Sequence, residues 1–313
     1  MIFHYLKIAF RNLCKYKTQN VISIIGLAVG LLCFCVCIYC SRFVENTDHC
    51  FANHDRIAEL NLYDGKAGRY FSGSPVPLAE ELRTWALGEA EAISSVTYPR
   101  ERPYYVELSP EKTLPYELET IEIDTCYNRI FTPEMVAGHW KMASQSLNSV
   151  ILSQSMAIKI FGNAESAIGK HMTLMRRLNT SPESTPKTGG IVYTIQAVMK
   201  DIPLNNSLDF MQNIDMLTVN DSEGLLQSPK RHNMTGANTY VLLSPQTTCT
   251  DLEKQFSKRD YTYTLYGEAY TVTASSMGAR LKKQGASYLG LVTGIIGTLI
   301  LLVGLINFFH FLI

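Results

Sequence analysis

Two long apolar runs enclose a middle region in which apolar and polar residues alternate over short stretches. The first run, Val21 to Cys40, contains no charged residue. At about 1.5 Å per residue, a helix of this length spans about 30 Å, which is the thickness of a bilayer's hydrocarbon core. The second run, Ser287 to Ile313, contains no Asp, Glu, Lys or Arg. The pattern therefore predicts transmembrane helices at residues 21–42 and 287–313.

A cleaved signal peptide and a buried core helix are the alternatives for the first run. The apolar region of a signal peptide has about 7–15 residues and ends in small residues at a cleavage site. This run is longer and ends in Tyr39-Cys40-Ser41-Arg42. A core helix of this length usually contains a charged residue. We therefore expect an uncleaved transmembrane helix.

The segment before the first run is basic and amphipathic. Apolar residues recur on one face at helical spacing, whereas Lys7, Arg11 and Lys15 share the other face. Basic residues beside a membrane helix favour the cytoplasmic side. We therefore expect residues 1–20 to form a cytoplasmic interfacial helix, and residues 43–286 to form an extracytoplasmic domain.

Both apolar runs contain glycines at a spacing that allows close helix packing. Gly26 and Gly30 form a G-x-x-x-G motif in the first run, and Gly290 and Gly294 form one in the second. Glycines at this spacing let helices approach closely in a membrane. The motif predicts a helix-packing role for these four residues.

The middle region mixes strand and helix patterns, which predicts an α+β fold. In residues 117–125, Leu118, Ile121 and Ile123 are interspersed with acids, as in a half-buried strand. Ser153 is expected to cap a helix that Gly162 ends. Further strands are expected at 93–98, 150–152, 171–176, 191–199 and 239–243, and helices at 78–87, 154–161 and 250–256.

Charged and cysteine residues are distributed unevenly along the chain. All 28 acidic residues lie between Glu45 and Glu268, and no basic cluster in the middle region indicates nucleic-acid binding. Of the eight cysteines, four lie within the first apolar run and Cys14 lies in the basic segment before it. Within the run, thiols two positions apart point to different sides of a helix and are not expected to share a metal ion. A disulfide between two of Cys50, Cys126 and Cys249 remains open.

The sequence contains no recognisable catalytic, cofactor-binding or metal-binding motif. The segment Gly162–His171 differs from a P-loop, because six residues separate its glycines where four are needed. In addition, His171 stands where Ser or Thr should bind magnesium. We therefore expect no catalysis, cofactor or ATP hydrolysis in this chain itself, and substrate-binding residues cannot be assigned.

Several segments, in order along the chain, carry a resemblance to a known family. They are Phe51–Ile57, Val150–Gly162 with Ile168-Gly169-Lys170, Tyr193–Ser207, Tyr240–Leu243 and the Leu305-Ile-Asn-Phe-Phe end of the second apolar run. In the same order, these segments resemble those of the MacB-type, FtsX-like permeases of ABC transporters, in which the stretch similar to Phe51–Ile57 leads into the first strand of the core domain.

The resemblance implies a MacB-like periplasmic core domain held by two helices in the inner membrane of a bacterium. It implies a porter-like subdomain at 43–115 and 236–286, with an inserted, strand-rich, sabre-like subdomain at 116–235. The implied function is a permease subunit that transmits motion from a separate ATP-binding subunit to the periplasm, for export of a periplasmic substrate. Other implied partners are a second permease copy or homologue, membrane lipid, and a periplasmic adaptor or lipoprotein.

Permeases of this family have further helices after the second one, whereas this chain ends there. We therefore expect either a fragment or a second polypeptide that supplies the remaining helices, and no coupling to ATP hydrolysis by this chain alone. The alternative function is a two-helix membrane sensor with a periplasmic ligand-binding domain, although such sensors continue into cytoplasmic helical modules. A membrane-anchored enzyme is disfavoured by the lack of catalytic residues.

Overall fold

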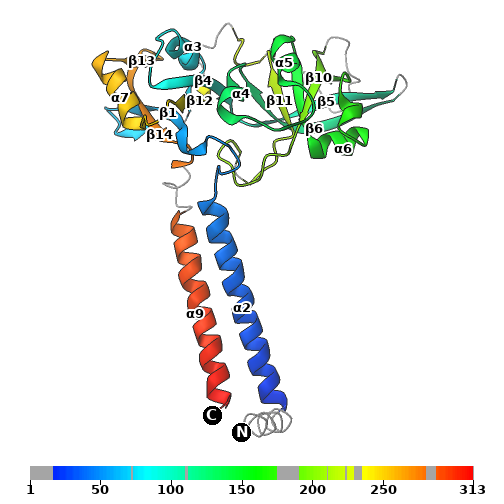
Figure 1. Cartoon of the computed structure of the whole chain (residues 1–313), viewed down its shortest axis with the longest axis vertical. Helices are drawn as coiled ribbons and strands as arrows, with labels where there is room; N and C mark the ends of the chain where they lie inside the picture. Colours follow the sequence, from blue (N-terminus) through cyan, green and yellow to red (C-terminus); the bar gives the residue numbers. More distant parts are fainter. Residues whose placement is uncertain are drawn as a thin grey trace. The chain divides into compact units, whose positions relative to one another are not determined.

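The computed structural model describes residues 17–71, 73–109, 112–174, 190–209, 211–222, 224–228, 235–279 and 287–312 (Figure 1). The chain divides into two units. One contains helices α2 (Lys17–Glu45) and α9 (Ser287–Leu312), and the other is a domain at residues 48–279. The sequence predicts an interfacial helix at residues 1–20. Its residues 1–16 lie outside the described residues, and its residues 17–20 belong to α2, which begins at Lys17.

Helices α2 and α9 are antiparallel and lie side by side (Figure 1). In α2, the segment Ile24–Glu45 is long and apolar enough to cross a membrane, as predicted for the first run. In α9, side chains are described for Leu291–Ile306. This apolar stretch is shorter than a membrane span requires. The second transmembrane helix therefore stays a prediction.

The domain is α+β, as predicted. One half, called the first half below, is an antiparallel sheet made of strands from both ends of the domain's sequence. Helices α3 (Leu78–Arg83) and α7 (Cys249–Lys258) cover one face of this sheet. The sheet order is β4 (Ala90–Thr97), β12 (Thr235–Leu243), β1 (Ile57–Asp64), β14 (Glu268–Ser276) and β13 (Thr262–Leu265), with short β2 (Arg69–Tyr70) beside β1 and β3 (Ser74–Pro75) beside β12.

Side chains of this sheet alternate between two hydrophobic cores, because successive residues of a strand point to opposite faces. In β12, Val241 and Leu243 lie in the core under α3 and α7, whereas Tyr240 and Leu242 lie in the core on the other face. Helix α3 is shorter than the predicted 78–87, because Ala86 has a left-handed backbone with φ of 47° and cannot continue a helix.

The second half of the domain is a closed β-barrel, which the sequence did not predict. Strand β6 pairs in parallel with β11, and this pairing closes a ring in which each strand pairs with its two neighbours. Closure removes the free strand edges of an open sheet. In ring order the strands are β5 (Arg100–Ser109), β6 (Lys112–Ile123), β11 (Met216–Val219), β8 (Ser149–Ser153), β10 (Val192–Met199) and β9 (His171–Leu174).

Shorter elements lie around this barrel and beside the first sheet. Strand β7 pairs with β10 outside the ring. These elements are η1 (His54–Arg56), α4 (Tyr127–Phe131), β7 (Met135–Gly138), α5 (Trp140–Gln145), α6 (Gln154–Phe161) and η2 (Glu165–Ala167).

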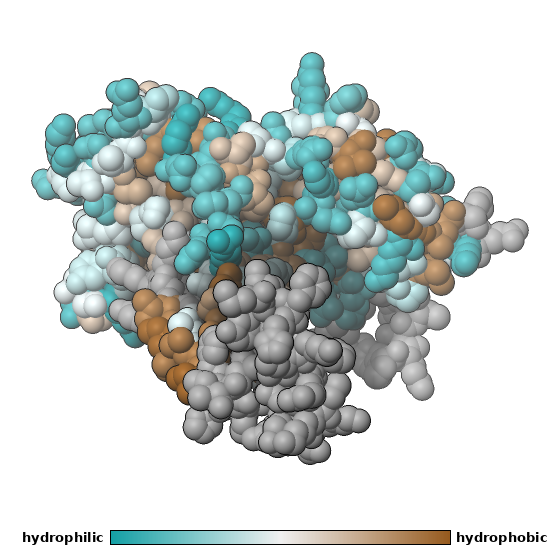
Figure 2. Space-filling view, turned by 60° about the horizontal axis from the view of Figure 1, so that its bottom comes forward, coloured by the Kyte–Doolittle hydropathy of each residue, from teal (hydrophilic) through white to brown (hydrophobic). Residues whose placement is uncertain are grey.

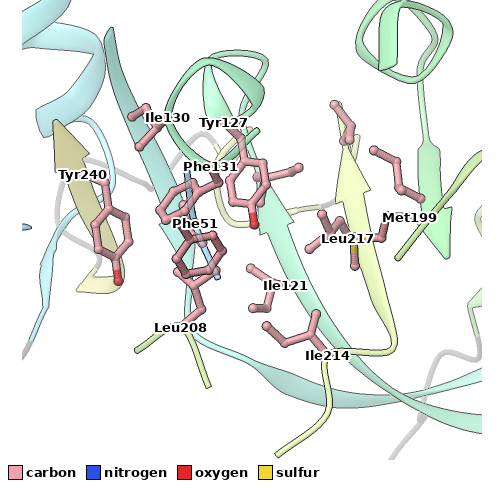
Figure 3. Packing of buried hydrophobic residues seen from close by; sticks show 14 of the residues in the cluster. Phe51, Ile121, Tyr127, Ile130, Phe131, Met199, Leu208, Ile214, Leu217 and Tyr240 are labelled. Atoms are coloured by element: carbon pink, nitrogen blue, oxygen red, sulfur yellow. The ribbon is translucent and has the colours of Figure 1, made fainter. Parts of the chain in front are cut away.

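Buried side chains fill the barrel and also join it to the first half. Tyr104, Leu118 and Tyr193 belong to the core inside the barrel. Outside it, a second core combines Phe51 and Phe131 with residues of both halves (Figure 3). The Phe131 ring lies 5.0 Å from the Phe51 ring and 5.2 Å from that of Tyr240, between centroids. The predicted subdomain boundary at 115/116 falls within β6, whose pairing with β5 places both strands in the barrel.

The structure confirms the local elements predicted around the Val150–Gly162 segment. Helix α6 begins after Ser153, whose hydroxyl accepts a hydrogen bond from the Met156 N–H, and ends at Gly162 with φ of 87°. Gly169 also has positive φ, at 77°. These conformations suit glycine because they crowd a Cβ atom. The segment is therefore a helix end and a turn, as predicted, and not a phosphate-binding loop.

Replacing Leu118 in the barrel core by alanine should lower the free energy of unfolding by about 2–5 kcal/mol, because the buried side chain leaves a cavity. Urea unfolding of the solubilised chain, followed by the fluorescence of Trp85 and Trp140, measures this loss within the domain. The matched control is Leu147→Ala, at a side chain that is 70% exposed, which should change stability by less than about 0.5 kcal/mol. Equal effects would contradict the barrel assignment.

Candidate functional site

The two segments that lead to the helices leave the domain on neighbouring strands. Strand β1 is the first long strand after α2, and β14 is the last before α9. They pair antiparallel, with Ala58 at the start of β1 opposite Ser276 at the end of β14. Both connections therefore start from adjacent points of one hydrogen-bonded sheet.

Asp48 joins these segments at the edge of the domain. It is 4% exposed and has a left-handed backbone, with φ of 71°. Its N–H donates to the Asn205 carbonyl at 2.9 Å, and its carboxylate accepts hydrogen bonds from the Ser207 N–H at 2.6 Å and from the Ser207 hydroxyl. A Cβ atom at Gly278 would lie 2.7 Å from Asp48 Oδ2. The segment after α2, the loop after β10 and the segment before α9 therefore meet at one carboxylate.

The loop that reaches Asp48 is held in shape by Asn206, which is fully buried. The Asn206 side-chain carbonyl accepts from the N–H groups of Leu208 and Asp209, at 3.0 and 2.9 Å, and its amide donates to the Pro203 carbonyl at 2.7 Å. Such local bonds are typical of asparagine in turns. The Tyr193–Ser207 motif thus encodes β10 and a rigid loop that presents Ser207.

The chemistry of this junction is structural. Partial desolvation and the charge of Asp48 raise the pKa of the Cys50 thiol to about 11, so the thiol stays protonated and is a poor nucleophile. Cys50, Cys126 and Cys249 are free thiols in the structure. Within the described residues, no group of three or more His, Cys, Asp or Glu side chains is arranged to hold a metal ion. The hydrogen bonds of the junction hold the Asp48 segment against the loop that carries Ser207.

The helix pair places the four glycines named from the sequence in different positions. A Cβ atom at Gly30 would lie 3.3 Å from the Ile300 carbonyl oxygen, so Gly30 lies at the contact between α2 and α9. Cβ atoms at Gly26 and Gly294 would meet nothing within 4 Å. The surroundings of Gly290 lie outside the part of the chain whose side chains are described.

Two further glycines at the helix contact were missed because they do not form a G-x-x-x-G motif. A Cβ atom at Gly297 would lie 2.9 Å from the Cβ of Cys37, and one at Gly304 would lie 3.7 Å from the Gly26 carbonyl. They are seven positions apart, the repeat that keeps positions on one face of paired helices. A search for this spacing would have found them.

A cysteine at Gly297 should form a disulfide with the natural Cys37, because the two Cβ positions are close enough after a small adjustment. Oxidation in membranes followed by peptide mapping measures the cross-link. Gly294→Cys, at a position that contacts nothing within 4 Å, is the control and should not cross-link to Cys37. Equal cross-linking at both positions would rule out this helix register.

Asp48→Ala should lower the free energy of unfolding of the domain by about 1–3 kcal/mol, because the Ser207 N–H loses its acceptor. Urea unfolding followed by tryptophan fluorescence measures the loss. Asp55→Ala is the control, since the Asp55 side chain is 87% exposed, and it should have little effect. An Asp48 variant as stable as this control would show that the junction is not fastened by its carboxylate.

Comparison with known proteins identifies the fold of the chain. The sequence matches no family model, and no curated protein sequence is significantly similar to it. The structure is similar to a domain of a protein provisionally assigned as a permease from Porphyromonas gingivalis, with a TM-score of 0.53 and 22% sequence identity. The likeness covers 72% of this chain and 93% of that domain.

Two further solved structures resemble the chain more loosely. The periplasmic region of MacB from Actinobacillus actinomycetemcomitans has a TM-score of 0.49 and 14% identity, over 78% of this chain and 97% of that one. The extracellular domain of the noncanonic ABC-type transporter YknZ from Gram-positive bacteria has a TM-score of 0.42 and 11% identity, over 70% and 99%. On the strength of the first likeness, this chain contains a domain with the fold of a permease domain, as its sequence motifs predicted.

Proposed function

We propose that this chain is part of a permease subunit of a MacB/FtsX-type ABC transporter, and that its domain passes motion of the membrane helices to an extracytoplasmic substrate or partner. The observation that carries the proposal is the fold shared with a permease domain. The apolar segment Ile24–Glu45 supports an anchor in the membrane. The face of the domain seen in Figure 2 supports a location in water, because its apolar patches are small and separated by hydrophilic residues.

The first step of the proposed transmission is the junction at Asp48. A displacement of the segment after α2 pulls on Asp48, which is hydrogen-bonded to Ser207, and the segment before α9 passes close to the same carboxylate at Gly278. Because the start of β1 pairs with the end of β14, both segments act on neighbouring strands of the sheet. The backbone hydrogen bonds of the sheet then pass the displacement to β12 and β4 without any catalytic step.

The second step is the connection between the two halves of the domain. Strands β4 and β6 share the single ladder pair Val96–Ile123. Next to it, the Asp124 carboxylate accepts hydrogen bonds from the Ser94 hydroxyl at 2.7 Å, the Ser95 N–H at 2.9 Å and the Arg83 guanidinium at 2.7 Å. A short ladder reinforced by side-chain bonds can transmit a force and still bend.

The proposed assignment of subdomains follows these halves. We assign the half with α3 and α7 as the porter-like subdomain, 43–115 and 236–286, less the strand β5, which belongs to the barrel. The barrel is the sabre-like subdomain, 116–235, extended by β5. The proposed location is the inner membrane of a bacterium, with the N-terminus in the cytoplasm, the domain in the periplasm and α9 as the second span.

The proposed partners are those of a permease subunit. A separate ATP-binding subunit hydrolyses ATP, and a second permease copy or homologue completes the membrane part. Lipid surrounds the exposed apolar side chains of the helices, such as Leu32 and Leu291. A periplasmic adaptor or lipoprotein receives the motion of the domain.

Purification of the full chain from membranes of its native host tests the proposal. We expect an ABC-type ATP-binding subunit to co-purify in fixed stoichiometry, and ATP hydrolysis by the complex in lipid nanodiscs. Asp48→Ala should weaken the coupling between the domain and this activity, whereas Asp55→Ala should leave it unchanged. A fixed complex with a histidine kinase or response regulator, and no ATP-binding subunit, would instead establish the sensor.

A further inference from the structure

The end of β6 places a carboxylate inside one end of the barrel. Leu118, Thr120 and Glu122 alternate along the inner face of β6, whereas Ile121 and Ile123 point outward into the core shared with the first half. Glu122 is only 4% exposed. The sequence pattern of a half-buried strand places the acids on the solvent face. The structure instead buries the Glu122 side chain at the end of the barrel.

Other charged groups meet Glu122 at this end of the barrel. Arg100 and Arg102 from β5 line the same small cavity. Asp221, which follows β11 and is fully buried, accepts a hydrogen bond from the Tyr193 hydroxyl at 2.8 Å and lies 3.6 Å from Arg102 Nη1. The barrel is thus apolar along most of its length and ionic at one end.

Residues 224–228 close this ionic end, and Glu122 fastens them. The Glu122 carboxylate accepts hydrogen bonds from the N–H groups of Leu225 at 2.6 Å and Leu226 at 2.9 Å. Gly224 lies so close that any Cβ atom there would collide with the same carboxylate. In addition, Leu225 and Leu226 pack against Val76 and Ala237 of the first half of the domain. One carboxylate therefore holds the segment that bridges both halves.

The space around the carboxylate allows water to reach it. On the inner side lies a cavity of 10 Å³, enough for about one water molecule, and it is lined by Thr218. The buried Thr218 hydroxyl has no hydrogen-bond partner among the described residues, so the cavity suits a polar occupant. On the outer side, a groove of 290 Å³ is lined by Glu122, Asp221 and Leu226. A small outward movement of residues 224–228 would join the two spaces.

We propose that residues 224–228 are a movable cap over the ionic end of the barrel, and that the charge of Glu122 sets how often the cap opens. The cap makes two short hydrogen bonds to one side chain, and its Leu225 and Leu226 pack on the first half. Its opening would expose the buried Thr218, uncover more of the partly exposed Arg102, and loosen the contact between the halves. This inference concerns the domain itself and does not rest on the proposed transport role.

The direction of the effect follows from the two environments of Glu122. Burial, with a further contribution from the charge of Asp221, raises the pKa of the Glu122 carboxyl from 4.5 to about 7. Opening admits water, so the pKa falls back toward 4.5 in the open form. The proton thus binds the closed form more tightly. The closed cap is most stable below about pH 4.5 and loses stability as the pH rises through 7.

Other ionisable groups also face this site in the described part of the chain. On the inner side and beside the cavity they are Asp221, Arg100, Arg102, Tyr104 and Tyr193, and on the side of the groove they are Glu80, Arg83 and Asp124. Burial raises the pKa of both tyrosines, which keeps them neutral at ordinary pH. The described cap residues 224–228 carry no ionisable side chain. Titration near neutral pH therefore points to Glu122.

Hydrogen exchange measured by mass spectrometry on the full chain in lipid nanodiscs tests the cap. After correction for the intrinsic pH dependence of exchange, the peptide that contains Leu225 and Leu226 should lose protection by on the order of 100-fold between about pH 5 and about pH 8. A peptide from β8, deep in the barrel, should keep its protection over the same range. Constant or increasing protection of the cap peptide would overturn the proposal without any variant.

Matched variants identify the group that titrates. Glu122→Gln removes the charge and should abolish the pH dependence of cap protection, whatever its absolute level. Glu117→Gln, an exposed acid on the same strand, should leave the pH dependence unchanged. A pH dependence that persists in the Glu122 variant, or that disappears in the Glu117 variant, would assign the effect to another group and refute the role of Glu122.

Discussion

The antiparallel pairing of β1 with β14 is the contact on which the rest of the structure depends. These strands are separated by almost the whole domain in sequence, yet their ends lie opposite each other at Ala58 and Ser276. This pairing brings both chain ends of the domain close together, and the Asp48 carboxylate fastens the first of them to Ser207. It also places β1 between β12 and β14, so the first strand organises the sheet on which α3, α7 and the shared core are built.

The two halves of the domain bury the side chains of their strands in different ways. The first half is an open sheet with a hydrophobic core on each face, and its strand β12 is accordingly apolar at the successive positions Tyr240–Leu243. The barrel encloses one core and uses the other face of β6 and β11 to pack against the first half. Both faces of these two strands are consequently buried near their ends. The acid Glu122 therefore lies inside the barrel and is buried. The ionic end of the barrel is a result of this double burial.

Features set by neighbouring residues could be predicted from the sequence, whereas features set by distant ones could not. Ser153 and Gly162 define α6 through local capping, and both were predicted. The closure of the barrel depends on β6 pairing with β11, which leaves no periodic signal in either strand. The same holds for the site, since Asp48 and Ser207 are 159 positions apart. The Tyr193–Ser207 motif indicated a turn there, but nothing local to it indicated the acid that it binds.

The neighbouring ends of the domain have a consequence for how such proteins can change over time. A segment whose two ends lie side by side can be inserted into, or removed from, a short connection without moving the elements on either side. The domain has such neighbouring ends, because β1 and β14 are paired. Helices α2 and α9, on either side of it in the sequence, contact each other closely at Gly30 and Gly297. The domain can therefore be regarded as an exchangeable module. Recombination could replace it with a domain of another specificity while the helix pair keeps its packing.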